Sequence, residues 1–181
     1  FGRKRSGSAT MLRDLARDAG IEPAIITPTL DGRGHGKFSS SDARSALAEG
    51  RPQDAAYILG RPWSITGVVE KGRQIGRTID FPTANIRLGD LIAPAKGVYA
   101  VTIKHGERSL KGVANFGSRP TVDGEGVLLE VYIFDFDQNI YGDTIEVALH
   151  HFLRAEQRFD GLPALQAQIA KDCETARTLL A

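Results

Sequence analysis

Residues 128–134 read LLEVYIF, an apolar run that is rich in branched and aromatic side chains and holds a single acid. A short run of this composition predicts a buried β-strand. In an extended chain, Leu129, Val131 and Ile133 share one face, and Glu130 lies on the opposite face. The run therefore predicts a strand that carries one carboxyl group among apolar neighbours.

Further strand-like runs lie on both sides of this one. Most connections between them contain Gly or Asp, which are typical of turns. Several short strands at such spacing favour an antiparallel barrel or a sandwich. The runs span residues 64–70, 98–104, 110–115, 127–136 and 144–150.

The last part of the sequence predicts a helix that packs on this sheet. Asp160 is a candidate N-cap, and Pro163 falls in the first turn, where its missing N–H has no helical partner to lose. Apolar residues then recur on one helical face, and we assign the cysteine among them no chemistry. The apolar positions are Leu165, Ile169, Cys173, Ala176 and Leu180.

Residues 1–60 have a different character, with helical patterns around one short apolar run. Alternation of strand and helix is typical of an α/β unit, but this segment is too short to form a complete one. Because the chain begins with Phe1 instead of Met, we expect residues upstream of it. The predicted elements are helices over residues 10–19, 42–49 and 52–59 and a buried strand over residues 24–26.

The composition excludes several classes of protein. The chain has 181 residues, of which 41% are hydrophobic, and a formal net charge of +1. Such a small charge gives no electrostatic basis for binding nucleic acid. No run approaches the roughly 18 consecutive apolar residues of a membrane span, and the single cysteine excludes an internal disulfide. We therefore expect a cytoplasmic protein of one domain, or of one domain and part of another.

Residues 72–85, GRQIGRTIDFPTAN, place a basic turn with glycines before a Pro-Thr-Ala-Asn segment. If this segment is extended, Thr83 and Asn85 point to the same face and present two neutral oxygen ligands. Gly72 and Gly76 allow the backbone to approach a bulky anion. Because Mg²⁺ prefers oxygen ligands and phosphates, the segment predicts a metal–nucleotide site. The alternative is an ordinary strand entry, where Gly forms the turn and Pro takes the first strand position.

Glu130 also allows two interpretations. Burial among apolar neighbours would raise the pKa of its carboxyl group towards the range useful for a general base. Alternatively, the side chain lies on a half-exposed face and pairs with an Arg or Lys across the strands. The residues alone leave both interpretations open.

Four motifs then occur in a fixed order along the chain. They are residues 72–85, residues 115–121 (NFGSRPT), residues 129–142 (LEV…D…YG) and residues 153–159 (LRAEQRF). In this order they resemble the riboflavin kinase domain of the bacterial bifunctional riboflavin kinase/FMN adenylyltransferases, also called FAD synthetases. The resemblance covers about residues 60–181.

The resemblance implies a mainly β fold, in which residues 61–181 form a six-stranded antiparallel Greek-key barrel (riboflavin kinase-like) with a C-terminal helix. Residues 1–60 would be the end of an incomplete α/β nucleotidyltransferase domain. The implied reaction transfers the γ-phosphoryl group of ATP to the 5′-hydroxyl of riboflavin in the presence of Mg²⁺, which yields FMN and ADP. Neither nucleic acid nor a membrane is an implied partner, and the oligomeric state stays open.

The resemblance also implies roles for individual residues. Glu130 matches the catalytic carboxylate, and Thr83 and Asn85 match ligands of Mg²⁺ and of the ATP phosphates. The other positions that match the ATP site are Gly72, Arg77, Ile133, Asp135 and Tyr141. The positions that match flavin contacts are Arg154, Gln157 and Phe159.

The upstream segment is similar to the adenylyltransferase of the same family. Ser40, Ser41 and Arg44 match a Ser-Ser-Thr/Ser-x-x-Arg element, in which hydroxyl groups, the helix start and an arginine contact phosphate. The sequence contains no suitable His-x-Gly-His segment, so we expect no adenylylation of FMN by this chain alone, although we expect it of the full-length protein. Asp80 stands where the family usually has Gly, and its charge would either repel phosphates or point outward.

Two other functions would leave different patterns in the sequence. A non-catalytic flavin-binding barrel would bind flavin without forming FMN, and it needs neither the Thr83–Asn85 pair nor Glu130. A nucleic-acid-binding barrel would gather basic and aromatic residues on one face, whereas this chain has 7% aromatic residues and almost no net charge.

Overall fold

The computed structural model describes residues 3–24, 26, 29–30, 37–72, 81–88, 92–121 and 124–181, with the backbone alone for Arg5 and for residues 118–121 and 124–127. The chain forms two compact units, residues 1–38 and residues 39–181, and each is described separately.

The first unit contains α1 (Ala9–Asp18) and a short 3₁₀ helix, Arg3–Arg5. The side chain of Ser8 caps α1 by accepting a backbone hydrogen bond at 3.2 Å. The helix predicted in this region is thereby confirmed. The strand predicted over residues 24–26 is not found in the described part of this unit, and Ile25 lies outside the described residues.

The second unit begins with a helical hairpin of α2 (Ser40–Ala48) and α3 (Pro52–Leu59). Ser39 is the N-cap of α2, because its Oγ accepts a hydrogen bond from the N–H of Ser41 at 3.1 Å. Proline at the first position starts α3, as predicted. Both helices confirm the sequence-based assignment, with α3 matching it to the residue.

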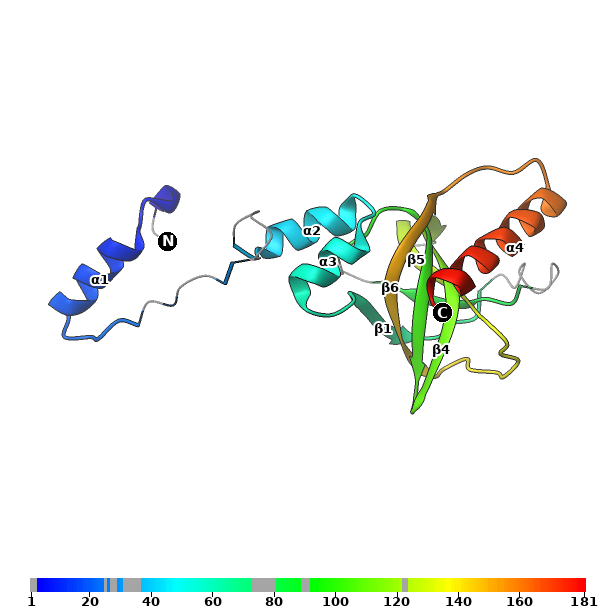
Figure 1. Cartoon of the computed structure of the whole chain (residues 1–181), viewed down its shortest axis with the longest axis horizontal. Coiled ribbons are helices and arrows are strands. Elements are labelled where there is room, and N and C mark those ends of the chain that lie inside the picture. The colour runs from blue at the N-terminus through cyan, green and yellow to red at the C-terminus, as the bar shows by residue number, and fades with distance from the viewer. Residues whose placement is uncertain are drawn as a thin grey trace. The chain divides into compact units, whose positions relative to one another are not determined.

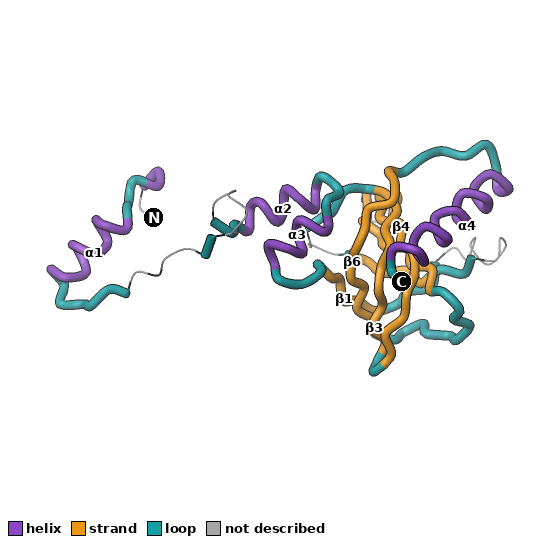
Figure 2. The backbone as a smooth tube through the Cα atoms, in the orientation of Figure 1, coloured by secondary structure: helices purple, strands orange, loops and turns teal. Residues whose placement is uncertain are grey.

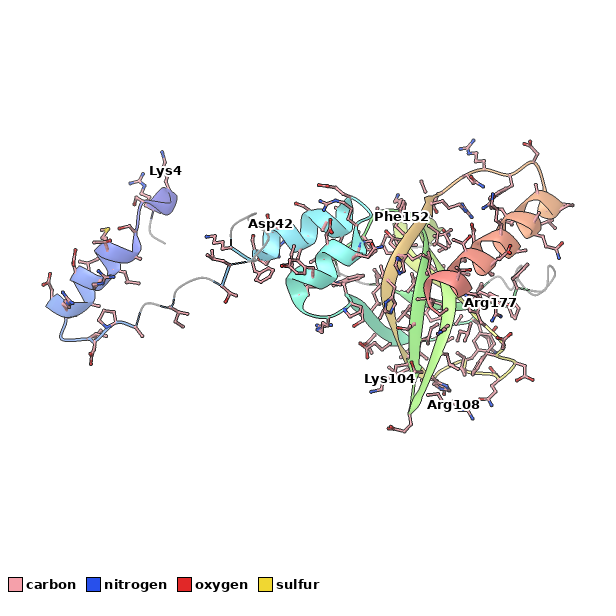
Figure 3. The ribbon with its side chains drawn as sticks, in the orientation of Figure 1. Lys4, Asp42, Lys104, Arg108, Phe152 and Arg177 are labelled. Carbon is pink, nitrogen blue, oxygen red and sulfur yellow. The ribbon has the colours of Figure 1, made fainter. Side chains whose placement is uncertain are left out.

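The hairpin packs on the barrel through Trp63, which contacts both the buried residues of the hairpin and the barrel core. At Gly50, where φ is +72°, a Cβ atom would lie 3.2 Å from the ring of Phe152, which Figure 3 labels. The helices and the barrel thus belong to one compact unit. The predicted division into domains of residues 1–60 and 61–181 is not tested by this packing and stays a prediction. The buried residues of the hairpin are Ala46, Leu47 and Ala55.

Within the described residues, six antiparallel strands form one sheet in the order β1-β6-β3-β4-β5-β2 (Figures 1 and 2). In β6-β3-β4-β5, the last strand in sequence returns beside the first of three consecutive strands, which is a Greek key. The two edges of the sheet meet where Glu70 N donates to Asn85 O at 2.8 Å, so the barrel is nearly closed. The predicted architecture is therefore confirmed. The strands are β1 (Ser64–Val68), β2 (Ala84–Arg87), β3 (Gly97–His105), β4 (Arg108–Thr121), β5 (Gly124–Ile133) and β6 (Thr144–Ala155).

The barrel interior is filled by side chains that alternate along the strands. Leu129, Val131 and Ile133 point into it, as the period of two predicted. Glu130, between them, therefore lies on the outer face, where it is half-buried. The largest fully buried side chains of this core are Tyr99, Phe116, Ile65, Ile86, Ile103, Leu129, Ile145 and Leu149.

The C-terminal helix α4 (Leu162–Leu179) lies against the outer face of the barrel (Figure 1). Cys173 and Ala176 are buried there, and burial raises the pKa of the Cys173 thiol to about 11, so the thiol stays protonated. Asp160 was wrongly predicted as the N-cap. That position is taken by Gly161, where φ is +131°, and no side chain caps the helix. The barrel residues under α4 are Val98, Ala100 and Val113 of the strands and Phe134, which directly follows β5.

None of the helices in the described part of the chain combines the length and the hydropathy needed to cross a membrane.

Closure of the barrel depends on a glycine in β1. A Cβ atom at Gly67 would lie 2.3 Å from Cγ2 of Ile86 on β2, whose side chain is fully buried. We expect Gly67→Val to lower the free energy of unfolding by about 1–3 kcal/mol through overpacking, measured by urea denaturation. Val68→Thr, at an exposed position of the same strand, is the control, with a change below about 0.5 kcal/mol. An unaltered midpoint for Gly67→Val would contradict this account of closure.

Candidate functional site

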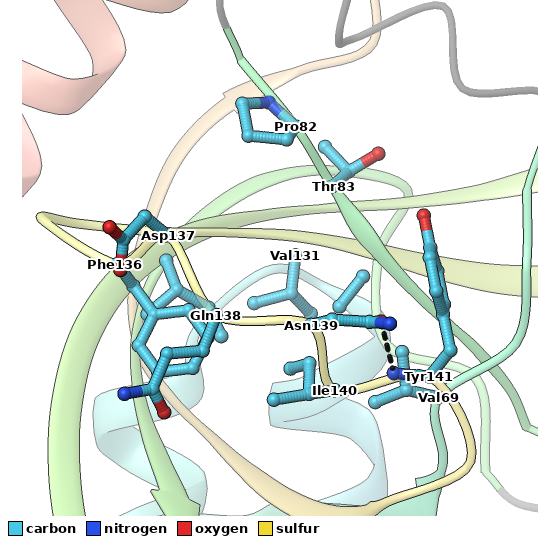
Figure 4. A pocket seen from close by; sticks show the side chains of 12 residues that line it. Val69, Pro82, Thr83, Val131, Phe136, Asp137, Gln138, Asn139, Ile140 and Tyr141 are labelled. Carbon is cyan, nitrogen blue, oxygen red and sulfur yellow. Dashed lines mark hydrogen bonds between the residues drawn. The ribbon is translucent and has the colours of Figure 1, made fainter.

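A pocket of about 470 Å³ opens beside β2, within the size range of small-molecule sites. Figure 4 shows side chains from β2, β5 and the loop between β5 and β6 around it. Thr83, Ile133 and Tyr141, three of the residues predicted to bind ATP, line this pocket. The loop keeps its shape partly because Tyr141 N donates to Asn139 Oδ1 at 3.2 Å. The remaining lining residues are Val69, Pro82, Ala84, Val131, Phe136, Asp137, Gln138, Asn139 and Ile140.

Asn85 lies next to this pocket, on the outer face of β2, and only 5% of its surface is exposed. Its Nδ2 donates to Thr83 O at 3.4 Å, which holds the amide over the start of the strand. Gly72 packs on the same amide, since a Cβ there would lie 2.4 Å from Asn85 Nδ2. The structure thus brings together three residues of the predicted metal–nucleotide site. Gly76, Arg77 and Asp80, the other residues that the sequence analysis names in this segment, lie outside the described residues.

The Oδ1 atom of Asn85 is buried and has no hydrogen-bond partner in the described part of the chain. An unsatisfied buried oxygen is unusual and points to a missing ligand. Groups of three or more His, Cys, Asp or Glu side chains that could hold a metal do not occur among the described residues. A cation here would therefore depend on neutral oxygens and on the phosphates of its substrate, as Mg²⁺ does with nucleotides.

Glu130 lies beside Asn85, because the two residues are direct partners in the antiparallel pairing of β2 and β5. On its other side, Glu130 pairs with Asn115 of β4. The Cβ atoms of such pairs are about 5 Å apart, so all three side chains share one patch of the outer face. The structure therefore places the side chain of Glu130 directly beside that of Asn85, the predicted metal ligand.

The flavin-side residues of the prediction lie near the other end of this face. Arg154, in β6, pairs with Asp172 of α4 at 2.8 Å, and its guanidinium carbon lies 5.6 Å from the centre of the Phe159 ring. Gln157 is exposed in the segment between β6 and α4. Arg154 and Phe159 are thus in contact with each other, and Gln157 lies between them along the chain.

Asp135 does not line the pocket. It pairs instead with Arg177 of α4, whose two Nη atoms donate to the carboxylate at 2.8 and 2.9 Å. Arg177 lowers the pKa of Asp135 by this hydrogen bonding, and its guanidinium also lies 4.3 Å from the centre of the Phe134 ring. Figure 3 labels this arginine on α4.

The serine element at the start of α2 is exposed. Ser41 donates its N–H to the cap residue, and Arg44 donates to Ser40 Oγ at 3.3 Å. The hydroxyl group, the helix start and the arginine therefore gather at one end of α2, as an anion site requires.

Sequence reasoning did not single out Asn115, Asp172 or any of the loop residues 136–140. Asn115 was visible in a motif, but its position beside Glu130 follows from strand register, which one sequence does not reveal. Asp172 lies beside the apolar positions of the C-terminal helix. Its partner, Arg154, is 18 residues away in sequence, so the ion pair leaves no local pattern. The loop residues are of ordinary polar and apolar types and carry no signal of their own.

Comparison with known proteins agrees with this geometry. The family model described as Flavokinase, riboflavin kinase, matches residues 59–180. Bifunctional riboflavin kinase/FMN adenylyltransferases from Haemophilus influenzae and Escherichia coli K12 are 46% and 43% identical to this chain over 180 and 178 residues. The alignments cover 98% of this chain but only 57% and 56% of those two proteins. The chain therefore spans a little over half the length of the curated relatives it matches.

A solved structure from Streptococcus pneumoniae, described as a macrolide-efflux protein, has the same fold. It is 35% identical, with a TM-score of 0.82, and the match covers 98% of this chain and 57% of that one. The family match covers most of the sequence and includes the pocket, the Asn85–Glu130 pair and α4. This chain belongs to the riboflavin kinase family.

Proposed function

We propose that this chain transfers the γ-phosphoryl group of ATP to the 5′-hydroxyl group of riboflavin and releases FMN and ADP. The observation that carries the proposal is the pairing of Asn85 with Glu130 beside a pocket of nucleotide-compatible size. A phosphoryl-transfer site needs a nucleotide pocket, a position for a metal and an acceptor for a proton, all within a few ångströms. The pocket, the Thr83–Asn85 pair and Glu130, all next to β2, support the assignment of these three roles.

ATP binds, in this proposal, with its base in the pocket and its phosphates towards Thr83 and Asn85. The pocket is lined by apolar side chains of β5 and by the loop before β6, which suits a planar base. Thr83 lines the pocket and Asn85 lies beyond it, so the two side chains lead from the pocket towards Glu130. Gly72 lets the chain pass close to this point, because any side chain there would displace the Asn85 amide.

A divalent cation, Mg²⁺ in our proposal, would be held by Thr83 Oγ1 and Asn85 Oδ1 together with the phosphates. When bound, it neutralises phosphate charge and so favours transfer. The unsatisfied Oδ1 of Asn85 supports this role.

Glu130 serves as the general base. Its carboxylate orients the 5′-hydroxyl of the ribityl chain and accepts the proton of that group as the oxygen bonds to the γ-phosphorus. The bond between this phosphorus and the β–γ bridging oxygen breaks, and ADP leaves. The half-buried outer face, with Asn115 on the other side of Glu130, is where the hydroxyl lies.

The flavin ring would lie further along the outer face, between the strands and the start of α4. Arg154 and Phe159 supply a cation and an aromatic ring in mutual contact there. A flavin-binding module without catalysis would also need such a platform, but it would need no acid beside a metal ligand. The kinase is therefore the better explanation.

For the full-length protein, we propose riboflavin kinase and FMN adenylyltransferase activity in the cytoplasm. The named relatives are bifunctional enzymes of greater length. Residues 1–60 would belong to the adenylyltransferase part, with Ser40, Ser41 and Arg44 contributing to its phosphate site.

The direct test incubates the chain with riboflavin, ATP and MgCl₂ and separates the flavins by chromatography. We expect FMN without FAD. Flavin binding without any FMN would contradict the kinase and favour the passive module.

Replacement of the proposed base should abolish turnover and spare nucleotide binding. We expect Glu130→Gln to lower kcat by about 10²–10⁴-fold, since proton acceptance is lost and the shape is kept. Binding of Mg-ADP, measured by calorimetry, should not change. Glu107→Gln, at an exposed turn between β3 and β4, is the matched control. A Glu130→Gln enzyme with turnover close to that of the control would refute the assignment.

Loss of the proposed metal ligands should weaken nucleotide binding. We expect Asn85→Ala and Thr83→Ala each to raise the Kd for Mg-ADP about tenfold, a loss of about 1.4 kcal/mol per ligand. Riboflavin binding, followed by the quenching of flavin fluorescence, should stay within twofold and serves as the internal control. If the Mg-ADP affinity is retained in both variants, the cation is held elsewhere.

Gly72 allows a test that leaves both ligands in place. We expect Gly72→Ala to mimic Asn85→Ala, because its methyl group would lie 2.4 Å from Asn85 Nδ2 and 2.9 Å from Oδ1. The measurement is again the Kd for Mg-ADP, with thermal unfolding to confirm that the variant folds. A folded Gly72→Ala protein with wild-type affinity would show that the orientation of the amide does not matter.

A further inference from the structure

Arg154 lies at the end of a line of paired residues on the outer face of the barrel. In the strand register, Glu130 lies opposite Asn115, Asn115 lies opposite Val98, and Val98 lies opposite Arg154. Three strand spacings separate Glu130 from Arg154, which is roughly 14 Å along the sheet. This distance suits an elongated substrate whose reacting hydroxyl lies at one end and whose ring system lies at the other.

Asp172, on α4, binds the guanidinium of Arg154 through both of its carboxylate oxygens. Arg154 Nε lies 3.1 Å from Oδ1 and 3.0 Å from Oδ2, and Nη2 lies 2.8 Å from Oδ2. Gln168, one turn earlier on α4, donates its Nε2 to Asp172 Oδ1 at 2.8 Å. The carboxylate is thus fixed from its own helix before it binds the arginine.

The ion pair of Arg154 and Asp172 is largely buried, which restricts the movement of both side chains. The side chain of Asp172 is 7% exposed and that of Arg154 is 19% exposed. A buried carboxylate needs a cation and good hydrogen bonds, because its desolvation is otherwise costly. Gln168 supplies a hydrogen bond but no charge, and the buried neighbours Cys173 and Ala176 supply neither, so the compensating charge comes from Arg154.

The remaining contacts fix the plane of the guanidinium. Nη1 donates to the carbonyl oxygen of Ala155 at 3.1 Å, and the Phe159 ring lies 5.6 Å from the guanidinium carbon. Among the described residues, these contacts leave one N–H on each Nη atom free to donate. A fixed planar cation with free donors suits a flat ring that carries carbonyl oxygens.

We propose that Asp172 is a positioning residue of the flavin site, which orients Arg154 so that its free N–H groups and the Phe159 ring receive the flavin ring. This inference rests on the proposed function and deepens it. Asp172 itself touches no substrate and acts through Arg154 alone. Gln168 supports it by holding the carboxylate.

The test compares the riboflavin and ATP dependence of Asp172→Asn. We expect the KM for riboflavin to rise about tenfold, the loss of one charged hydrogen bond, while the KM for ATP stays within twofold. Glu174→Gln, which removes an exposed carboxylate two residues further along α4, is the matched control and should leave both constants unchanged. Gln168→Leu keeps the ion pair and should raise the KM for riboflavin about threefold, so it serves if Asp172→Asn fails to fold.

A double-mutant cycle separates positioning from packing. If Asp172 acts through Arg154, the variant with both Arg154→Ala and Asp172→Asn has the same riboflavin KM as Arg154→Ala alone. Independent effects that multiply in the double variant would overturn the proposal. So would a riboflavin KM equal to that of Glu174→Gln in folded Asp172→Asn and Gln168→Leu, because a merely structural residue would alter only the unfolding temperature.

The same variants are titrated with riboflavin by fluorescence in the absence of ATP. If the wild-type chain binds flavin but forms no FMN, the kinase proposal fails, and a tenfold loss of flavin affinity in Asp172→Asn still supports the positioning role. If the wild-type chain binds no flavin at all, both proposals fail.

Discussion

The register between β2 and β5 is the constraint on which the site depends. It pairs Asn85 with Glu130 and turns Ala84 and Ile86 into the barrel interior. Because side chains alternate along a strand, a slip of one residue would turn the amide into the core and the isoleucine to the surface. Burial of Ile86 therefore fixes the position of the proposed metal ligand, and the packing of the barrel and the chemistry of the site have one cause.

In the proposed mechanism, the two substrates lie on opposite faces of strand β5. Val131 and Ile133 line the proposed nucleotide pocket on one side, and Glu130 lies on the other. The neighbour of β5 at the edge of the sheet is β2, a strand of only four residues. At such an edge, the phosphates of a nucleotide can reach the outer face without crossing the core, which supports the proposal that transfer occurs beside this short strand.

The alternation of side chains made most of the fold predictable from the sequence. The barrel strands β1, β3, β4, β5 and β6, the helical hairpin and α4 all followed from periodicity and from turn residues. β2 was not among the predicted runs, because four residues after a proline give too short a pattern. The predicted N-cap of α4, Asp160, was wrong. Gly161, which tolerates its positive φ, takes that position.

The site was predictable only as far as its motifs reached. Thr83, Asn85 and Glu130 could be singled out by residue type, but their proximity depends on register, which only the structure gives. Asp135 was expected at the nucleotide, and this stays a prediction; its ion pair with Arg177 could not be foreseen, because the arginine lies 42 residues away in sequence. Asp172 was overlooked because it lies beside the apolar positions of α4, although its ion pair with Arg154 is largely buried.

The central claim is that the metal–nucleotide complex binds between Asn85 and Glu130. Replacement of Mg²⁺ by paramagnetic Mn²⁺ in a complex with ADP, followed by amide NMR spectra of the labelled chain, tests it most directly. The account predicts strong broadening of the amide signals of residues 83–85 and 129–131, with sharp signals at the β3–β4 turn around Gly106. Broadening at that turn, with sharp signals for Asn85 and Glu130, would contradict it.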